Sequence, residues 1–134
     1  MRIKLMSVVA IAGVLLSTTL PLAAHHSFSA EFDLDKPIRL TGVVTKLEWT
    51  NPHAWFFMDV KDESGKVTNW GWELGSPNGL LRTGWNRNSL KLGTEVTVEG
   101  SRARDGGNTA NARVIIVTST GQRLFAASSQ PTTN

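Results

Sequence analysis

The sequence has no cysteine and no tyrosine among its 134 residues. Without cysteine, the chain forms no disulfide and offers no thiolate as a nucleophile or metal ligand, so any bound metal must be held by nitrogen and oxygen atoms. Without tyrosine, proton transfer and radical chemistry on a phenol are excluded. Histidine is scarce as well, since the chain has only His25, His26 and His53, in two short motifs. This scarcity makes the three imidazoles the first candidates for a function.

The N-terminal stretch has the order of a secretory signal. Two basic residues precede an apolar stretch over 5–20, which is marginal for a membrane span, and the small pair Ala23-Ala24 follows. We expect a signal peptide over 1–24 that is cleaved after Ala24, with cleavage after Ala23 as the alternative. The mature protein is then expected in the periplasm, without membrane attachment.

Charge and length limit the possible partners and the number of domains. Cleavage would remove Arg2 and Lys4 and lower the formal net charge from +3 to +1. No basic block would remain, so the charge pattern gives no basis for a nucleic-acid partner. We expect a lead segment over 25–36, one domain with a modest core over 37–126, and a disordered tail over 127–134.

The mature chain alternates apolar and polar residues in the manner of half-buried β-strands. A first strand is expected after Pro37, and its change of phase at Gly42 predicts a bend. A second strand over 54–60 and a third over 67–74 are joined by a predicted hairpin turn at 62–65. The pattern indicates a meander of three strands.

A short helix is predicted to start at Ser76-Pro77, because serine caps helix N-termini and proline suits the first helical position. Its buried face is expected to consist of Leu80, Leu81 and Trp85. Strands over 95–99 and 112–118 follow, with a last return at 124–125. This order predicts an all-β fold with one short helix, a small OB-fold-like five-stranded Greek-key barrel, with a small open sandwich as the rival.

Several motifs together resemble a family of small exported proteobacterial proteins known only as a domain of unknown function. They are His25-His26-Ser27-Phe28, Glu31-Phe32-Asp33, Trp49-Thr50-Asn51-Pro52-His53, the helix around Ser76-Pro77-Asn78 and Leu80-Leu81-Arg82, and Asn108-Thr109-Ala110. The resemblance covers nearly the whole mature chain. It implies export and domain boundaries but no established activity.

The three histidines predict a metal site, with a copper ion as the expected cofactor. Cleavage after Ala24 would make His25 the N-terminus, whose α-amine and imidazole would chelate one ion, while His53 would complete a histidine brace. His26 would add a ligand or orient its neighbour. Cleavage after Ala23 would instead give a third-position imidazole, an arrangement that binds Cu(II) or Ni(II) in a square plane.

Each of these residues also has a plainer interpretation. His25 and His26 are equally compatible with a solvated chain end, and His53 with a cap on a turn. A second hypothesis is a small-ligand or protein-interaction module without metal, with Trp49, Asn51 and Trp55 as ligand-binding residues. Trp70 and Trp72 are expected to fill the core. Glu31 or Asp33 would be an additional oxygen ligand, whereas Glu73 is expected to be solvated.

No catalytic arrangement is evident in the sequence. Ser27 beside His26 is not a triad, because adjacency in sequence does not place a base on a nucleophile. No phosphate-binding loop is present. We therefore expect a copper carrier or sensor using His25, His26 and His53 rather than an enzyme, with a metal ion or small ligand as its partner and a periplasmic protein as a further candidate.

Overall fold

The structure is a computed structural model that describes residues 28–128. Its elements run in the order β1 (Phe32–Glu48), β2 (Trp55–Lys61), β3 (Val67–Glu73), α3 (Pro77–Arg82), β4 (Glu95–Ala103), β5 (Thr109–Val117) and β6 (Arg123–Phe125). Residues 28–31, which precede β1, are helical. The predicted signal peptide over 1–24, His25 and His26 lie outside the described residues, as does most of the predicted tail.

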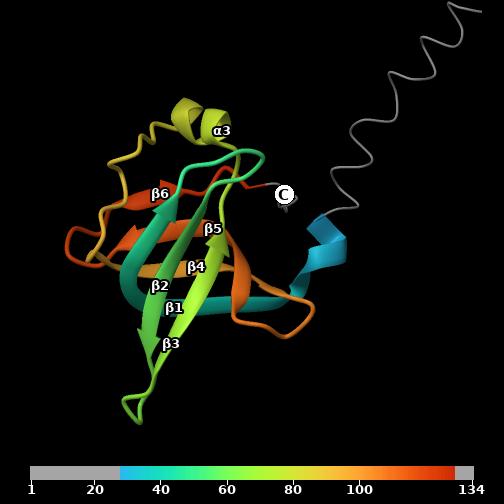
Figure 1. The fold of residues 1–134 in the computed structure, drawn as a ribbon, viewed down its shortest axis with the longest axis vertical. Helices are drawn as coiled ribbons and strands as arrows, with labels where there is room; N and C mark the ends of the chain where they lie inside the picture. The colour runs from blue at the N-terminus through green and yellow to red at the C-terminus, as the bar shows by residue number, and fades with distance from the viewer. Residues whose placement is uncertain (1–27, 129–134) are drawn as a thin grey trace, which may run out of the picture.

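The strands close into a barrel. Neighbours hydrogen-bond in the order β3-β2-β1-β4-β5-β6, and a parallel pairing of β3 with β5 closes the circle of five strands. Strand β6 extends the sheet beyond β5. Figure 1 shows α3 at one end of this barrel and the β2–β3 turn at the other. The prediction of an all-β, OB-like barrel with a short helix is confirmed.

Strand β1 is long enough to pair with two neighbours, and it curls visibly in Figure 1. Its first half pairs with β4 and its second half with β2, and Val43 belongs to both ladders. At Gly42 a Cβ atom would lie 2.5 Å from the backbone oxygen of Asp59, so glycine permits the close approach of β2. The predicted bend is therefore present.

The details of β1 differ from the prediction in two ways. The strand begins at Phe32, and Pro37 lies inside it, where a register shift between Phe32 and Pro37 accommodates a residue without an N–H group. The change of facing also comes later than predicted. Val44 keeps the facing of Ile38 and Leu40 and is buried, Val43 is exposed, and the register shift between Val44 and Lys46 changes the facing of the residues that follow.

The core lies inside the barrel and is dominated by β2 and β3. Phe56 and Trp72 are fully buried and stack with ring centroids 6.4 Å apart. Trp70 is also buried, so the core-filling interpretation of Trp70 and Trp72 is confirmed. From the β4–β5 side, the barrel is filled by Val96, Val98, Ala110, Ala112 and Ile115.

Helix α3 covers one end of the barrel. Ser76 caps it as predicted, because its side-chain oxygen accepts a hydrogen bond from the Gly79 N–H at 3.1 Å. Leu80 and Trp85 are buried, but Leu81 is 53% exposed, so its predicted burial is wrong. No helix within residues 28–128 has the length and apolarity needed to cross a bilayer.

Candidate functional site: a histidine–carboxylate cleft

The turn that carries His53 is fixed to the rim of the barrel by the residue that follows it. Ala54 is fully buried, its N–H donates to the Gly75 oxygen at 3.0 Å, and its oxygen accepts from the Leu74 N–H at 2.9 Å. These bonds continue the β2–β3 ladder by one more step. His53 therefore stands directly beyond the last paired residues of the barrel.

His53 contacts the carboxylate of Glu73 through its Nδ1 atom. The register pairs Trp55 with Glu73, and His53 lies two residues before Trp55 on the same face, which makes it the diagonal neighbour of Glu73. The side chain of Glu73 is 5% exposed, while that of His53 is 40% exposed. A buried acid thus holds one nitrogen of a half-exposed imidazole.

The environment of Glu73 changes its acidity. Burial raises the pKa of Glu73 above its usual value, and the nearby Glu31 carboxylate acts in the same direction. His53 opposes both effects through its charge and its hydrogen bond. Burial is the largest of these effects. The imidazole therefore offsets only part of the free-energy cost of an ionised carboxylate at this position.

A cleft of about 540 Å³ opens beside this pair. It is walled on one side by the residues before and at the start of β1 and on the other by the turn between β1 and β2. Three carboxylates and one imidazole line it, with no lysine or arginine among the lining residues. The lining consists of Phe28, Glu31, Phe32, Glu48, Thr50, Asn51, Pro52, His53, Trp55 and Glu73.

The lead segment is docked on the barrel beside this cleft. Phe28 and Phe32 are 5% and 4% exposed and lie with ring centroids 5.6 Å apart, in a small cluster with Ala103 and Trp55. Phe28 and Phe32 thus attach the described part of the lead segment to the barrel. The third apolar residue, Leu34, is 45% exposed and takes no part.

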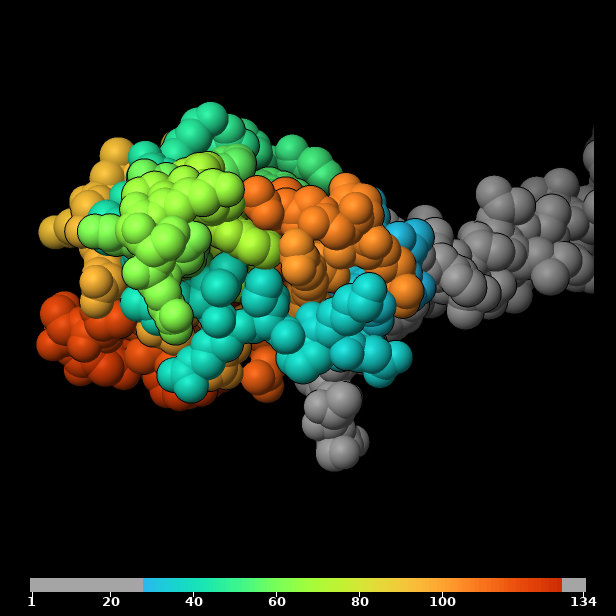
Figure 2. All heavy atoms as spheres, turned by 90° about the horizontal axis from the view of Figure 1, so that it is seen from below, coloured from blue at the N-terminus to red at the C-terminus, as the bar shows by residue number. Residues whose placement is uncertain are grey.

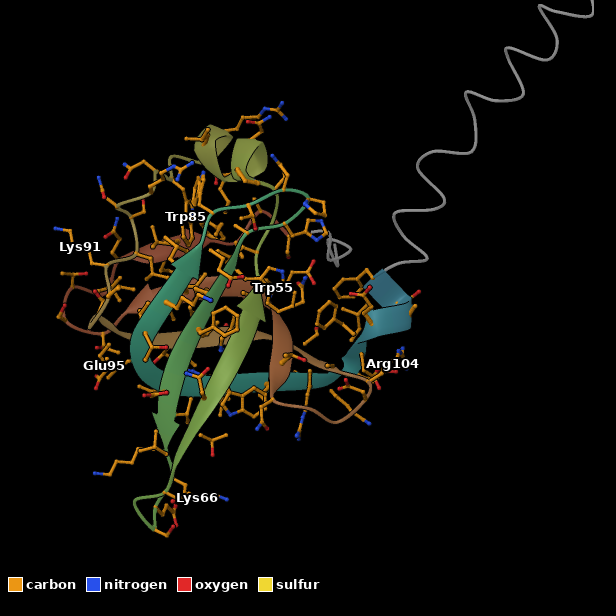
Figure 3. All side chains as sticks on the ribbon, viewed as in Figure 1. Trp55, Lys66, Trp85, Lys91, Glu95 and Arg104 are labelled. Carbon is orange, nitrogen blue, oxygen red and sulfur yellow. The ribbon has the colours of Figure 1, made fainter. Side chains whose placement is uncertain are left out.

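Arg104, in the turn between β4 and β5, adds polar contacts to the lead segment. Its Nε donates to the Ser29 oxygen at 2.6 Å, its backbone N–H donates to the Glu31 oxygen at 2.9 Å, and its guanidinium lies 3.6 Å from the Asp33 carboxylate. Figure 2 shows this turn against the lead segment, and Figure 3 shows Arg104 beside it. The segment is therefore held at the cleft by the apolar contacts of Phe28 and Phe32 and by the polar contacts of Arg104.

The structure brings three of the candidate residues together. Asn51, His53 and Trp55 all line the cleft. Of the two acidic residues considered as oxygen ligands, Glu31 lines it, whereas Asp33 pairs with Arg104 and Lys36 instead. Within residues 28–128, no group of three or more histidine, aspartate or glutamate side chains is gathered closely enough to hold a metal ion.

Trp49 lies elsewhere. It lines a second cleft of about 480 Å³, together with Lys46, Arg87 and Lys91. In Figure 3 Lys91 and Trp55 lie well apart, on different parts of the barrel. The two tryptophans that flank the turn therefore face surroundings of opposite charge and do not form one stacking surface.

Glu73 is the site residue that the sequence interpretation missed, and its expected solvation is wrong. A signal was available in the hairpin. Counting back from the Lys61–Val67 pair next to the turn places Trp55 opposite Glu73 and His53 on the same face. The burial itself could not be read from the strand, because that face meets the lead segment and the turn, which lie elsewhere in the sequence.

Fold and site together define a small OB-like barrel protein with an acidic cleft at its rim, in which a buried glutamate holds a histidine. The chain belongs to the family of unknown function DUF6152, whose model matches residues 12–112. The resemblance to an uncharacterised family is thereby confirmed.

Comparison with solved structures finds similarity to the N-terminal domain of the PriB protein from Thermoanaerobacter tencongensis, a structure described as dimeric. The identity is 26% and the TM-score 0.42, and the alignment covers 63% of this chain and 97% of that chain. No match was found among curated proteins.

Proposed function

We propose that the protein is an exported metal carrier or sensor, which binds a copper ion through the imidazole of His53 and the N-terminal residues His25 and His26. The observation that carries this proposal is that Phe28 and His53 line one cleft. His26 precedes Phe28 by two residues and His25 by three. An extended chain spans at most ~3.6 Å per residue, so both histidines are within reach of the cleft.

The chemistry of the cleft supports a cation as its ligand. Carboxylates and imidazole are nitrogen and oxygen donors, and a site with several imidazoles favours copper among the divalent first-row metals. The described donors alone do not complete a metal site. The proposal therefore requires the N-terminal nitrogens to supply the remaining ligands.

The first test fixes the N-terminus of the exported protein by intact mass and then follows a Cu(II) titration by tryptophan fluorescence. We expect one copper ion per chain and quenching of Trp55, which lines the cleft. Trp55→Phe should remove most of the quenching, whereas Trp49→Phe, whose ring lies in the second cleft, should retain it. Equal quenching in both variants would contradict binding at this cleft.

The second test removes the ligand. His53→Ala should weaken copper binding at least about tenfold, which corresponds to ~1.4 kcal/mol. Its thermal midpoint without copper serves as the folding control. If His53→Ala binds copper as tightly as the parent, the bridged site is wrong and the N-terminus alone chelates the ion. If no stoichiometric copper binding occurs, the module that binds a small ligand or protein becomes the favoured function.

A further inference from the structure

The contact between His53 and Glu73 leaves the two ring nitrogens of the histidine in different situations. Nδ1 is engaged by a carboxylate that is almost completely buried. Nε2, at the far side of the ring, has no hydrogen bond to another residue within the described range. The half-exposed ring lines the cleft, so Nε2 is the nitrogen that remains available to a ligand.

Glu73 occupies a position from which it cannot easily move. It is the last residue of β3 and is paired on one side with Trp55 of β2 and on the other with Asn111 of β5. Two residues later, the Gly75 N–H donates to the Ala126 oxygen at 2.7 Å. The carboxylate is therefore carried by a strand residue that is paired on both sides, while His53 lies in a turn.

We propose that Glu73 is the positioning residue of the metal site, which holds His53 by Nδ1 so that the metal is bound through Nε2. This inference rests on the proposed function. Histidine ligands of metals commonly donate their second ring N–H to a carboxylate, which fixes the tautomer and the ring orientation and makes the ligating nitrogen more basic. Here the carboxylate is already in place before any metal arrives.

The burial of Glu73 is the feature that a purely structural role does not explain. An outward-facing glutamate at the end of a strand normally reaches water, and a buried carboxylate is costly unless a partner stabilises it. Glu73 shares the cleft with residues of the lead segment and of the turn, and His53 is its ion-pair partner within the described residues. The arrangement fixes the orientation of the His53 ring, and it requires the Glu73 carboxylate to be buried.

The test compares two substitutions of Glu73. Glu73→Leu removes the acceptor, so the imidazole can rotate, and copper affinity should fall about 10–100-fold. Glu73→Gln keeps an oxygen that accepts from Nδ1–H and should recover most of that loss. Glu48→Gln is the matched control, because it removes a negative charge from the same cleft without touching His53. It should change the affinity less than threefold.

A spectroscopic measurement distinguishes positioning from a general loss of structure. Pulsed electron paramagnetic resonance of the Cu(II) protein should detect the remote Nδ1 of a coordinated imidazole, and its quadrupole coupling should change in Glu73→Gln and more in Glu73→Leu. Thermal midpoints without copper report folding. If Glu73→Leu does not fold, the Glu73→Gln spectrum decides the question.

The outcomes separate this inference from the proposed function. A loss of affinity in His53→Ala with none in either Glu73 variant would overturn the positioning role and leave the copper site intact. Unchanged affinity in His53→Ala would overturn the proposed function itself. A loss in Glu48→Gln as large as that in Glu73→Leu would assign the effect to charge and overturn positioning.

Discussion

Gly100 lies where the backbone of β5 comes too close to β4 for a side chain. The β4–β5 ladder shifts register between Glu99 and Gly100, and a Cβ atom at Gly100 would lie 1.9 Å from the backbone oxygen of Asn111. Backbone cannot give way as a flexible side chain can. Gly100→Ala should therefore destabilise the protein by about 3 kcal/mol or more, as overpacking does at its upper range.

Urea unfolding of this variant checks the expectation. Gly107→Ala is the matched control, because the nearest atom to its added Cβ would be the Asp105 carboxylate at 3.1 Å, the end of an exposed side chain. That substitution should cost less than about 1 kcal/mol. Similar losses in the two variants would show that the close strand approach does not govern stability here.

Asp62 gives the β2–β3 turn a pH dependence. Its carboxylate accepts bonds from the Ser64 hydroxyl at 2.6 Å and from the N–H groups of Ser64 and Lys66 at 2.9 and 3.0 Å. The Ser64 hydroxyl bond is the largest cause that lowers the pKa of Asp62 below its usual 3.8. A lowered pKa means that the folded state favours the ionised form.

The stabilising contribution of Asp62 is therefore present above about pH 4 and is lost as the pH falls through the folded-state value. Asp62→Ala should lower the urea midpoint at pH 7, and the gap to the parent protein should narrow at pH 2. Because the group is fully exposed, we expect a small effect. A gap of the same size at both pH values would contradict a role for the ionised carboxylate.

The burial of a residue was predictable from the sequence where it follows from the alternation of its own strand. It was not predictable where it depends on contacts with a segment distant in sequence. Trp72 follows from the alternation of β3, because a strand must bury one face. Glu73 lies on the other face and lines one cleft with Phe28, which is more than 40 positions away in the sequence. His53 was recognised by its rarity, but its carboxylate partner became apparent only from the register.

At the scale of elements, α3 depends strongly on its cap because it has only six residues. Short helices are marginally stable by themselves. The hydrogen bond that Ser76 accepts from the Gly79 N–H therefore contributes much of the stability of α3. Ser76→Ala should lower stability by about 1 kcal/mol. Thermal unfolding measures this, and Ser76→Asp, which also caps, should stay within about 0.5 kcal/mol of the parent protein. A loss in Ser76→Asp equal to that in Ser76→Ala would assign the effect to side-chain packing.

Element boundaries illustrate what a single sequence can supply. The cap at Ser76 and the turn at 62–65 use local chemistry, and both are where the sequence predicts them. The start of β1 is not local. Proline in the interior of a strand is normally unfavourable. Strand β1 includes Pro37 because its ladder with β4 shifts register between Phe32 and Pro37. Such a compensation in a partner strand leaves no signal in the segment itself.

At the scale of the whole molecule, the barrel holds the described part of the lead segment and the His53 turn at the same rim, so that residues 28–32 and the turn between β1 and β2 line one cleft. The OB-like order predicts the loop between β1 and β2 at a binding face. It does not predict the contribution of Arg104, whose side chain and backbone bind the residues just before β1, next to the Phe32–Ala103 pair of the β1–β4 ladder. The docking of the lead segment is the tertiary feature on which the proposed copper site depends.

The composition of the chain also limits the oxidation state of a copper ion at the proposed site. There is no cysteine, and Met58, the methionine of the described range, is fully buried in the core. The cleft therefore supplies imidazole and carboxylate but no sulfur, and soft sulfur ligands are what favour Cu(I). We expect the loaded protein to retain Cu(II) in the presence of a weak competing chelator and to release the ion on reduction with ascorbate when a Cu(I)-specific chelator is present. Recovery of Trp55 fluorescence measures the release, and the same chelator without ascorbate is the control. Retention of the ion after reduction would contradict the expected preference for Cu(II).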